Sequence, residues 1–236
     1  MNPIIIITGG TKGIGKAIIT TFMANGFDVI TCARNEQDLL VLQAEMQLKF
    51  PTSKLLYKAA DLSIRKEVDD FSNYIHEQTS SVAILVNNTG VFIPGQIHNE
   101  AAGTLEKTME TNVYSAYHLT RALVPGMMER KSGHIFTICS TASITAYPNG
   151  GSYCISKYAL LGMTKVLREE MKPHGIRVTA VLPGATLTDS WRGTDLPEDR
   201  FIDPLDVSES IYAAYNLSKR AVIEEILIRP QLGDLD

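Results

Sequence analysis

The sequence has few of the features that mark secreted, metal-binding or nucleic-acid-binding proteins. It contains three cysteines, an odd number without metal-ligand spacing, which argues against a disulfide framework and favours a reducing compartment. Its five histidines are scattered, so no metal site is expected. Lys and Arg total 22 against 26 Asp and Glu, with no basic run. We therefore predict neither nucleic acid nor membrane among its partners.

Long hydrophobic runs are also missing. The apolar opening segment, residues 1–7, is too short to cross a bilayer and carries no basic leader, which predicts a cytoplasmic protein. The 236 residues are 44% hydrophobic, enough to bury one substantial core, and show no internal repeat. One domain over residues 1–236 is the expectation at this size.

What the sequence does contain is an alternation of short β-branched runs with longer amphipathic stretches. Such alternation indicates βαβ units, right-handed crossovers and a parallel sheet. We therefore predict an α/β fold of the Rossmann type, doubly wound, with a seven-stranded, mainly parallel sheet and helices on both faces. Strands are expected at 4–7, 27–32, 54–59, 83–87, 133–139, 177–182 and 222–228, and helices at 13–24, 36–49, 103–130 and 151–174.

Residues 183–206 break this alternation. They show no clear period and are rich in Gly, Pro, Asp and Thr. In an open α/β sheet, ligands bind beyond the carboxyl ends of the strands, and this segment follows such an end. It is therefore a candidate substrate lid.

A glycine-rich turn, Thr8–Gly15, joins the first expected strand to the first expected helix. Glycines let the backbone turn tightly and approach a pyrophosphate, and the helix N-terminus offers unpaired N–H groups. The position of the turn indicates a dinucleotide site, although a tight turn without a ligand would use the same residues. The expected cofactor-binding residues of this turn are Gly9, Thr11, Lys12, Gly13, Ile14 and Gly15.

The end of the second expected strand, residues 31–35, distinguishes the two nicotinamide cofactors. An NAD site usually places an acidic residue there to accept from the ribose 2′-hydroxyl, and none is present. Arg34 can instead hold a 2′-phosphate through charge-assisted hydrogen bonds, and Lys12 would lie near the same group. The pair favours NADP(H) as the cofactor, and the alternative is two solvated surface cations.

Four residues form the candidate catalytic group. Tyr153 and Lys157 stand four residues apart in an expected helix, so they share one face. A free tyrosine has a pKa of about 10, and acid–base work near neutrality needs positive charge beside the phenol. The same spacing occurs on ordinary helix surfaces, but two further residues support the pair. Ser140 is expected at the carboxyl end of a strand, over the same crevice, and Asn112 is a polar residue inside a long helix.

These motifs stand in the order in which the short-chain dehydrogenase/reductase family carries them, and the chain resembles that family along essentially its whole length. The resemblance implies the strand order 3-2-1-4-5-6-7 and an NADP-preferring oxidoreductase that acts on carbonyl and alcohol groups. The matching motifs are Thr8–Gly15, Asp61-Leu62, Asn87–Gly90, Asn112, Ser140, Tyr153 with Lys157, and Pro183-Gly184 with Thr188.

The resemblance also implies a role for each matching residue. Tyr153 would be the general acid in reduction, and Ser140 would hold the substrate oxygen. Lys157 would bind the nicotinamide ribose and favour the phenolate of Tyr153, with Asn112 supporting a water-linked proton path to it. Tyr153 and Lys157 would thus also contact the cofactor. Further cofactor contacts would come from Asp61, Leu62, Asn88, Gly90, Pro183, Gly184 and Thr188.

The two longest expected helices carry more apolar side chains than one sheet face needs. In the family such helices pair across a two-fold axis, which implies a homodimer or homotetramer. The residues that suggest this on the first helix are Tyr114, Tyr117, Leu119, Leu123 and Met127.

The substrate is less defined than the chemistry. Trp191 and the tail 224–234 are similar to those of bacterial sepiapterin reductase-like members, and an indole there would either stack on a planar substrate or pack on its own loop. The alternative is a 3-oxoacyl-[acyl-carrier-protein] reductase, whose two docking arginines fall at Lys131 and His174 here. The modest lid favours a small or medium carbonyl substrate over a steroid. A non-catalytic NADP-binding sensor or scaffold is the alternative of another class.

Overall fold

The computed structural model describes residues 2–191 and 193–235, so residues 1, 192 and 236 of the expected domain and lid lie outside the described residues. One seven-stranded sheet runs through the molecule in the expected order, β3-β2-β1-β4-β5-β6-β7. The sheet was expected to be mainly parallel, and every neighbouring pair of strands is parallel. The strands are β1 (Ile4–Thr8), β2 (Asp28–Ala33), β3 (Leu55–Ala59), β4 (Val82–Asn87), β5 (Gly133–Ile138), β6 (Ile176–Pro183) and β7 (Glu225–Ile228).

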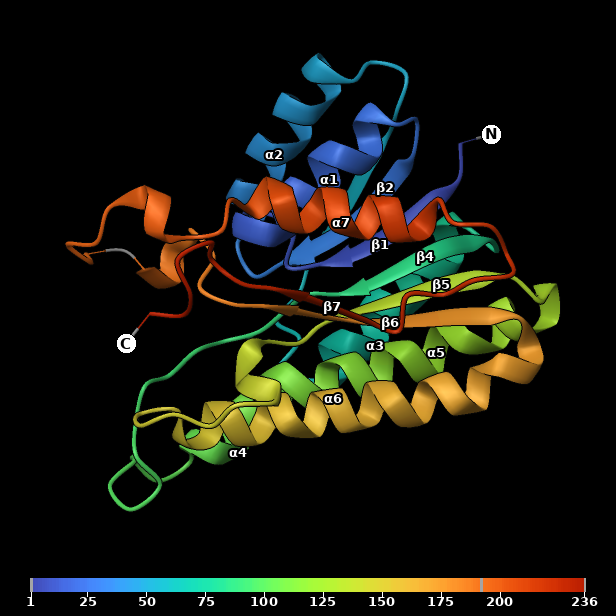
Figure 1. The fold of residues 1–236 in the computed structure, drawn as a ribbon. Coiled ribbons are helices and arrows are strands. Elements are labelled where there is room, and N and C mark those ends of the chain that lie inside the picture. Colours follow the sequence, from blue (N-terminus) through green and yellow to red (C-terminus); the bar gives the residue numbers. More distant parts are fainter. Residues whose placement is uncertain (1, 192, 236) are drawn as a thin grey trace.

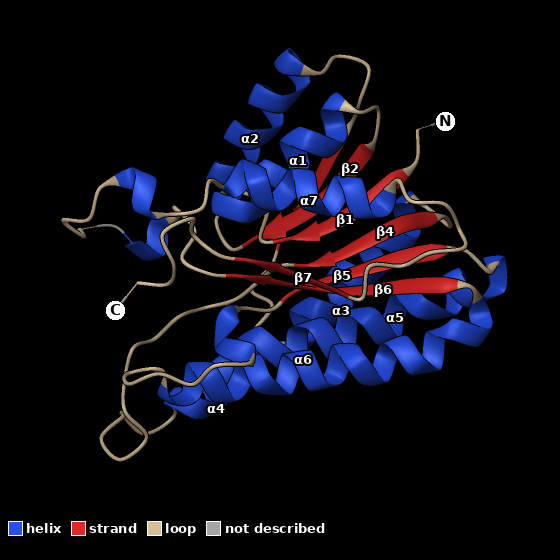
Figure 2. Cartoon of the chain, in the orientation of Figure 1, coloured by secondary structure: helices blue, strands red, loops and turns tan. Residues whose placement is uncertain are grey.

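Helices cover both faces of this sheet (Figures 1 and 2). One face carries α1 (Gly13–Ala24), α2 (Glu36–Lys49) and α7 (Pro204–Tyr215). The other carries α3 (Arg65–Gln78), α4 (Thr104–Met109), α5 (Ser115–Arg130) and α6 (Gly151–Met171). The doubly wound arrangement predicted from the alternation is therefore confirmed.

The central strand β1 shows why a continuous apolar run marks a sheet covered on both faces. Ile5, Ile6 and Ile7 are all fully buried. Successive side chains of a strand point to opposite faces, so Ile5 and Ile7 enter the core that contains Phe22, whereas Ile6 enters the core that contains Phe71. The glycine turn follows the carboxyl end of β1, so it lies near the middle of that edge of the sheet.

Aromatic side chains join α1 to α7. Phe22 packs edge-on against Phe27, Tyr212 and Tyr215, with ring centroids 5.0, 5.4 and 6.2 Å apart. Nearby, the hydroxyl groups of Thr21 and Ser208 lie 2.8 Å apart. Edge-on pairs of this kind stabilise a fold beyond the area that they bury.

The expected helix 103–130 is interrupted. After α4, a π-helical turn, Glu110–Tyr114, precedes α5. A π turn adds one residue to a helical turn, so the hydrophobic period of the sequence does not reveal it. The expected lid range 183–206 also ends inside a helix, because α7 begins at Pro204 after the Asp203 cap.

The five apolar residues expected in excess on the 103–130 segment divide into two groups. Leu119, Leu123 and Met127 are buried under the sheet. Tyr114 and Tyr117 are 49% and 42% exposed, and both line an apolar hollow to which Met163 of α6 also contributes. Ordinary packing on the sheet therefore accounts for the first three residues only.

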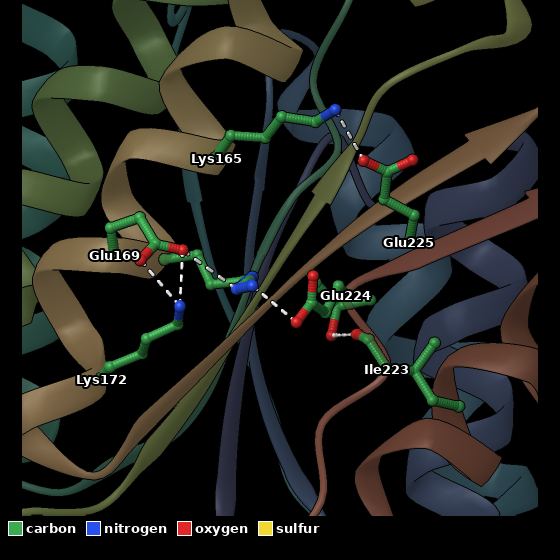
Figure 3. A network of polar contacts seen from close by, with 8 residues as sticks. Lys165, Glu169, Lys172, Ile223, Glu224 and Glu225 are labelled. Carbon is green, nitrogen blue, oxygen red and sulfur yellow. Dashed lines mark hydrogen bonds and ion pairs between the residues drawn. The ribbon is translucent and has the colours of Figure 1, made fainter.

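Ion pairs at the surface, each with an exposed glutamate, connect α6 to the edge strand β7 and the residues before it (Figure 3). Lys165 Nζ lies 2.8 Å from Glu225, and the Glu224 carboxylate lies 2.5 Å from the guanidinium of Arg168. Such pairs each add little to the free energy of unfolding. Their effect is local, because they hold the segment that leads through β7 to the C-terminal residues.

His134 lies near the start of β5, an inner strand of the sheet, and is fully buried, with its ring stacked 3.9 Å from that of Phe136. The Thr179 hydroxyl donates to Ile223 O and therefore accepts from His134 Nε2, 2.8 Å away. Burial and the charge of Arg177 lower the pKa of His134 to about 2. The folded protein thus holds a neutral imidazole at any moderate pH.

This histidine should make the protein sensitive to mild acid. Below a pH of about 6.5 an unfolded histidine binds a proton that folded His134 does not, so acid favours unfolding. From this residue alone, the free energy of unfolding should fall by about 1.4 kcal/mol per pH unit below that point. Urea titrations of the wild type and His134→Gln at about pH 7 and about pH 5 measure the slope. We expect the variant to show a flatter dependence on pH, and an unchanged slope would contradict the assignment.

Candidate active site

A cavity of about 830 Å³ opens at the carboxyl ends of the strands. This is the edge at which open α/β sheets bind their ligands. Every residue predicted to bind cofactor or substrate lines it, as do three of the four predicted catalytic residues, while Asn112 lies behind its wall. The predicted residues in the lining are Gly9, Thr11, Lys12, Gly13, Ile14, Gly15, Arg34, Asp61, Leu62, Asn88, Gly90, Ser140, Tyr153, Lys157, Pro183, Gly184, Thr188 and Trp191.

The glycine turn packs closely on its surroundings at Gly10 and Gly15. A Cβ at Gly15 would lie 2.2 Å from the Gly9 carbonyl oxygen, and one at Gly10 would lie 2.2 Å from Thr31 Oγ1. In the described part of the chain, no side chain caps α1. The first N–H groups of α1 are therefore available to an anion, which suits the diphosphate of a dinucleotide.

Asn88 binds the glycine turn to the end of β4. Its Nδ2 donates to the carbonyl oxygens of Thr8 at 2.8 Å and Gly9 at 3.1 Å. In return, Thr8 Oγ1 accepts from the N–H groups of Asn88 and Thr89, both at 2.9 Å. These bonds fix the relative position of two strand ends.

Farther along the rim, the Asp61 carboxylate accepts from the Ser63 hydroxyl at 2.8 Å.

The two cations predicted for the 2′-phosphate take different positions. Arg34 follows β2 directly and is exposed at the cavity rim. Lys12 reaches instead to the 183–206 segment, where its Nζ lies 3.3 Å from the Asp189 carboxylate. Asp38 also lines this end of the cavity. Arg34 is therefore exposed at the cavity rim, whereas Lys12 pairs with the candidate lid segment.

Tyr153, Lys157 and Ser140 line the same cavity. On α6, Lys157 Nζ lies 5.7 Å from the centre of the Tyr153 ring and donates to Ile138 O at 2.9 Å. Lys157 is only 5% exposed, so little solvent screens its charge. Ser140 follows β5, and its Oγ accepts from the Ala142 N–H at 3.1 Å, which fixes the hydroxyl oxygen in the wall.

The hydrogen bonds of Asn112 explain why this polar residue lies inside a long helical segment. Its Oδ1 accepts from the Val91 N–H at 2.7 Å, and its Nδ2 donates to Val91 O at 3.0 Å and to Ser156 Oγ at 2.9 Å. It therefore holds the loop after β4 against α6. A Cβ at Gly90 would lie 3.4 Å from Asn112 Oδ1 and 3.7 Å from Lys157 Nζ, so glycine there leaves room between the two groups.

Aromatic residues that the sequence did not reveal line the cavity with Tyr153. Phe92 packs edge-on against the Tyr153 ring, with centroids 4.9 Å apart, and Tyr147 is also in the lining. Burial raises the pKa of the Tyr147 hydroxyl, which stays protonated. Trp191 packs on Phe201 at 5.1 Å, within its own segment, and also lines the cavity. Stacking of its indole on a substrate stays a prediction. Phe92 and Tyr147 lie in irregular loops, where no local pattern marks them.

This arrangement can now be compared with known proteins. Residues 3–198 match the family model for short chain dehydrogenases. The chain belongs to the short-chain dehydrogenase family. This short-chain dehydrogenase is therefore an oxidoreductase, and the family recognised from its ordered motifs is confirmed.

Individual relatives cover most or all of the chain. Sepiapterin reductase of Chlorobaculum tepidum is 31% identical over 100% of this chain and 99% of that protein. The 3alpha-hydroxysteroid dehydrogenase of Mediterraneibacter gnavus is 35% identical over 80% of this chain and 75% of its own length. A solved metagenomic short-chain oxidoreductase in complex with NADP is 27% identical and covers 97% of each chain, with a TM-score of 0.85. The cofactor held by that neighbour is the one expected from Arg34 and Lys12.

The cysteines of this short-chain dehydrogenase are packing residues. Cys32, Cys139 and Cys154 are all buried and free. Burial raises the pKa of Cys32 to about 12 and that of Cys139 to about 11, so both thiols are neutral and unreactive.

Among residues 2–191 and 193–235, no cluster of side chains suited to a metal ion is found. No helix in the same ranges is long and apolar enough to span a membrane.

Proposed function

We propose that this short-chain dehydrogenase reduces a small or medium carbonyl compound to an alcohol, with NADPH as the cofactor and Tyr153 as the proton donor. One observation carries the proposal. The same cavity contains Tyr153, Lys157 and Ser140 together with the uncapped glycine turn and Arg34. A non-catalytic sensor would need only the cofactor-binding part of this set.

The chain's own residues account for the proton side of the reaction. NADPH bound in the cavity would supply the hydride to the carbonyl carbon. Ser140 Oγ would hold the carbonyl oxygen by a hydrogen bond. Tyr153 would then give that oxygen its proton, and the buried ammonium of Lys157 would stabilise the phenolate that remains. The gap at Gly90, between Asn112 and Lys157, leaves room for the water-linked path that would return the proton.

The cofactor-binding residues fit NADPH better than NADH. The N-terminus of α1 suits the diphosphate, and Arg34 suits a 2′-phosphate at a rim where residues 31–35 contain no acid. The solved relative that holds NADP supports the same choice. Asp61, Leu62, Pro183, Gly184 and Thr188 would complete the contacts.

The cavity favours a compact, planar substrate. Phe92, Tyr147 and Trp191 supply aromatic surface to its lining. About 830 Å³ is within the range of a site for one ligand, and here it must hold a dinucleotide as well. A substrate like sepiapterin, which the name of one relative indicates, fits this space better than a steroid, which the name of another indicates. The 183–206 segment would act as the lid through Trp191.

The carrier-protein alternative receives little support within one chain. Lys131 and His174 lie just before β5 and β6, at the amino ends of these strands. The cavity opens at the opposite edge of the sheet, and neither residue lines it. A basic docking rim at the entrance is therefore not formed by these two residues of a single chain.

Self-association and location complete the proposal. The exposed Tyr114 and Tyr117 and the hollow between α5 and α6 would meet a second copy across a two-fold axis, giving a homodimer or homotetramer. Three buried, unpaired cysteines are compatible with a cytoplasmic location. Size-exclusion chromatography with light scattering measures the first point.

Turnover of a carbonyl panel tests the function. NADPH oxidation is followed by absorbance with sepiapterin, an acetoacetyl thioester and 1-phenyl-1,2-propanedione, and NADH is run in parallel. We expect turnover of sepiapterin or the diketone with a clear preference for NADPH. Turnover of the thioester alone would favour the carrier-protein alternative. Tight NADPH binding with no turnover of any carbonyl would support the non-catalytic reading.

A further inference from the structure

A carboxylate from a distant loop caps the start of the helix that carries Tyr153. Glu100 accepts from the Ser152 N–H at 2.8 Å, and the Ser152 hydroxyl donates to the same carboxylate. The N-cap residue of α6, Gly150, has no side chain to do this. A negative charge at a helix N-terminus is also favoured by the helix dipole. Glu100 thus supplies the cap that the local sequence lacks.

The fit around this carboxylate is close. A Cβ at Gly151 would lie 2.0 Å from Glu100 Oε1, and one at Gly95 would lie 2.6 Å from Glu100 Cγ. The Gly95 N–H also donates to Asn149 O at 3.0 Å, which pairs the two backbones. Ser152 is 1% exposed, so its bonds to Glu100 compete with little water.

The loop that carries Glu100 joins β4 to α4 over residues 88–103 and is called the Phe92 loop below. It also contacts the Tyr153 ring. Ser152 immediately precedes Tyr153, and Phe92 packs edge-on against that ring. Asn112 holds the near end of the loop at Val91, and Glu100 holds its far end on α6. Because Phe92 is 41% exposed, the two ends of the loop must keep it in place.

We infer that Glu100 is a positioning residue for the reaction: it fixes the first turn of α6 and the Phe92 loop as one unit, and so sets where the Tyr153 hydroxyl stands relative to Ser140. Glu100 is not among the residues that line the cavity, so it acts through Ser152 and not on a ligand. The inference rests on the proposed reductase function. It predicts an effect on the chemical step without an effect on cofactor binding.

Two substitutions of Glu100 separate the loss of the whole cap from the loss of its negative charge alone. Glu100→Ala removes the cap and should lower kcat about tenfold, because small misplacements of reacting groups are costly. Glu100→Gln keeps an acceptor for the Ser152 N–H and should stay within about threefold of the wild type. The Kd for NADPH, measured by fluorescence titration, should change less than about twofold in both. Glu129→Ala, an exposed glutamate on α5, is the matched control and should resemble the wild type in every assay.

A double-mutant cycle tests whether Glu100 acts through Ser152. Ser152→Ala should lower kcat modestly, since the backbone N–H still reaches the carboxylate. In the Glu100→Ala background the same change should have almost no further effect on kcat, because the partner is already gone. Independent, additive losses would overturn the inference. So would a Glu100→Ala enzyme with wild-type kcat, or one whose loss of activity follows an equal loss of NADPH binding.

Hydrogen–deuterium exchange supplies a readout that does not depend on turnover. With NADPH present, peptides covering 150–157 and 91–103 should exchange faster in Glu100→Ala than in Glu129→Ala, while a peptide from α1 should not change. If the wild type reduces none of the panel carbonyls, the proposed function fails, and this exchange result still reports whether Glu100 fixes the loop and helix. Unchanged exchange in both peptides would contradict the inference directly.

Discussion

Tyr153→Phe should lower kcat for carbonyl reduction by about a thousandfold, because it removes the group that protonates the substrate oxygen. The substitution keeps the ring, and with it the edge-on contact to Phe92 and the position of Lys157 over the ring. NADPH binding should therefore stay within about twofold of the wild type. Trp191, the only tryptophan of the sequence, lines the cavity and provides a fluorescence signal for that titration.

The control for this experiment is another tyrosine of the same helix. Tyr158 is exposed on α6 and does not line the cavity, so Tyr158→Phe should keep wild-type activity. If Tyr153→Phe retained most of its turnover, another group would have to donate the proton, and the proposed mechanism would be wrong. If it lost NADPH binding together with turnover, Tyr153 would be a binding residue before anything else.

Arg34→Ala should raise the KM for NADPH by roughly 10- to 100-fold, the loss expected for a charge-assisted hydrogen bond to phosphate. The KM for NADH, which has no 2′-phosphate, should change by less than about threefold. Arg34 should carry most of this selectivity, since Lys12 is engaged by Asp189. Steady-state kinetics with both cofactors measure the two effects in one preparation.

Lys16→Ala is the matched control for Arg34→Ala. Lys16 also lies near the glycine turn, but it pairs with Glu45 at 2.7 Å and does not line the cavity. It should leave both KM values nearly unchanged. Equal losses for NADPH and NADH in Arg34→Ala would mean that Arg34 contacts a part common to both cofactors, and the 2′-phosphate assignment would be withdrawn.

The sequence was informative wherever function depends on residues close together in the chain. The turn Thr8–Gly15 and the Tyr153/Lys157 spacing are local, so both could be read from the residues themselves. The strand order and the other members of the cavity were implied by the family resemblance that these motifs support. The π turn at Asn112 could not, because one extra residue in a helical turn leaves the hydrophobic pattern almost unchanged. The partner of the Asn112 side chain is the backbone of Val91, which belongs to a different element.

Residues that act across long separations were hidden for the same reason. Glu100 meets Ser152 over 52 positions, and Phe92 meets Tyr153 only after two loops have folded onto α6. The pairing of Lys12 with Asp189 likewise joins distant segments. Composition and spacing describe neighbours along the chain, whereas these contacts depend on how the whole sheet edge closes.

The packing of α1 against α7 has a consequence for how the chain is made. The Phe22 ring packs against Tyr212 and Tyr215. The Thr21 hydroxyl bonds to that of Ser208, which lies 187 residues farther along the chain. At ribosomal rates of about 5–20 residues per second, roughly ten seconds or more separate the synthesis of the two helices. For that interval the apolar side chains of α1 that pack on α7 have no partner, so nascent chains that end before α7 should need a chaperone to remain unaggregated.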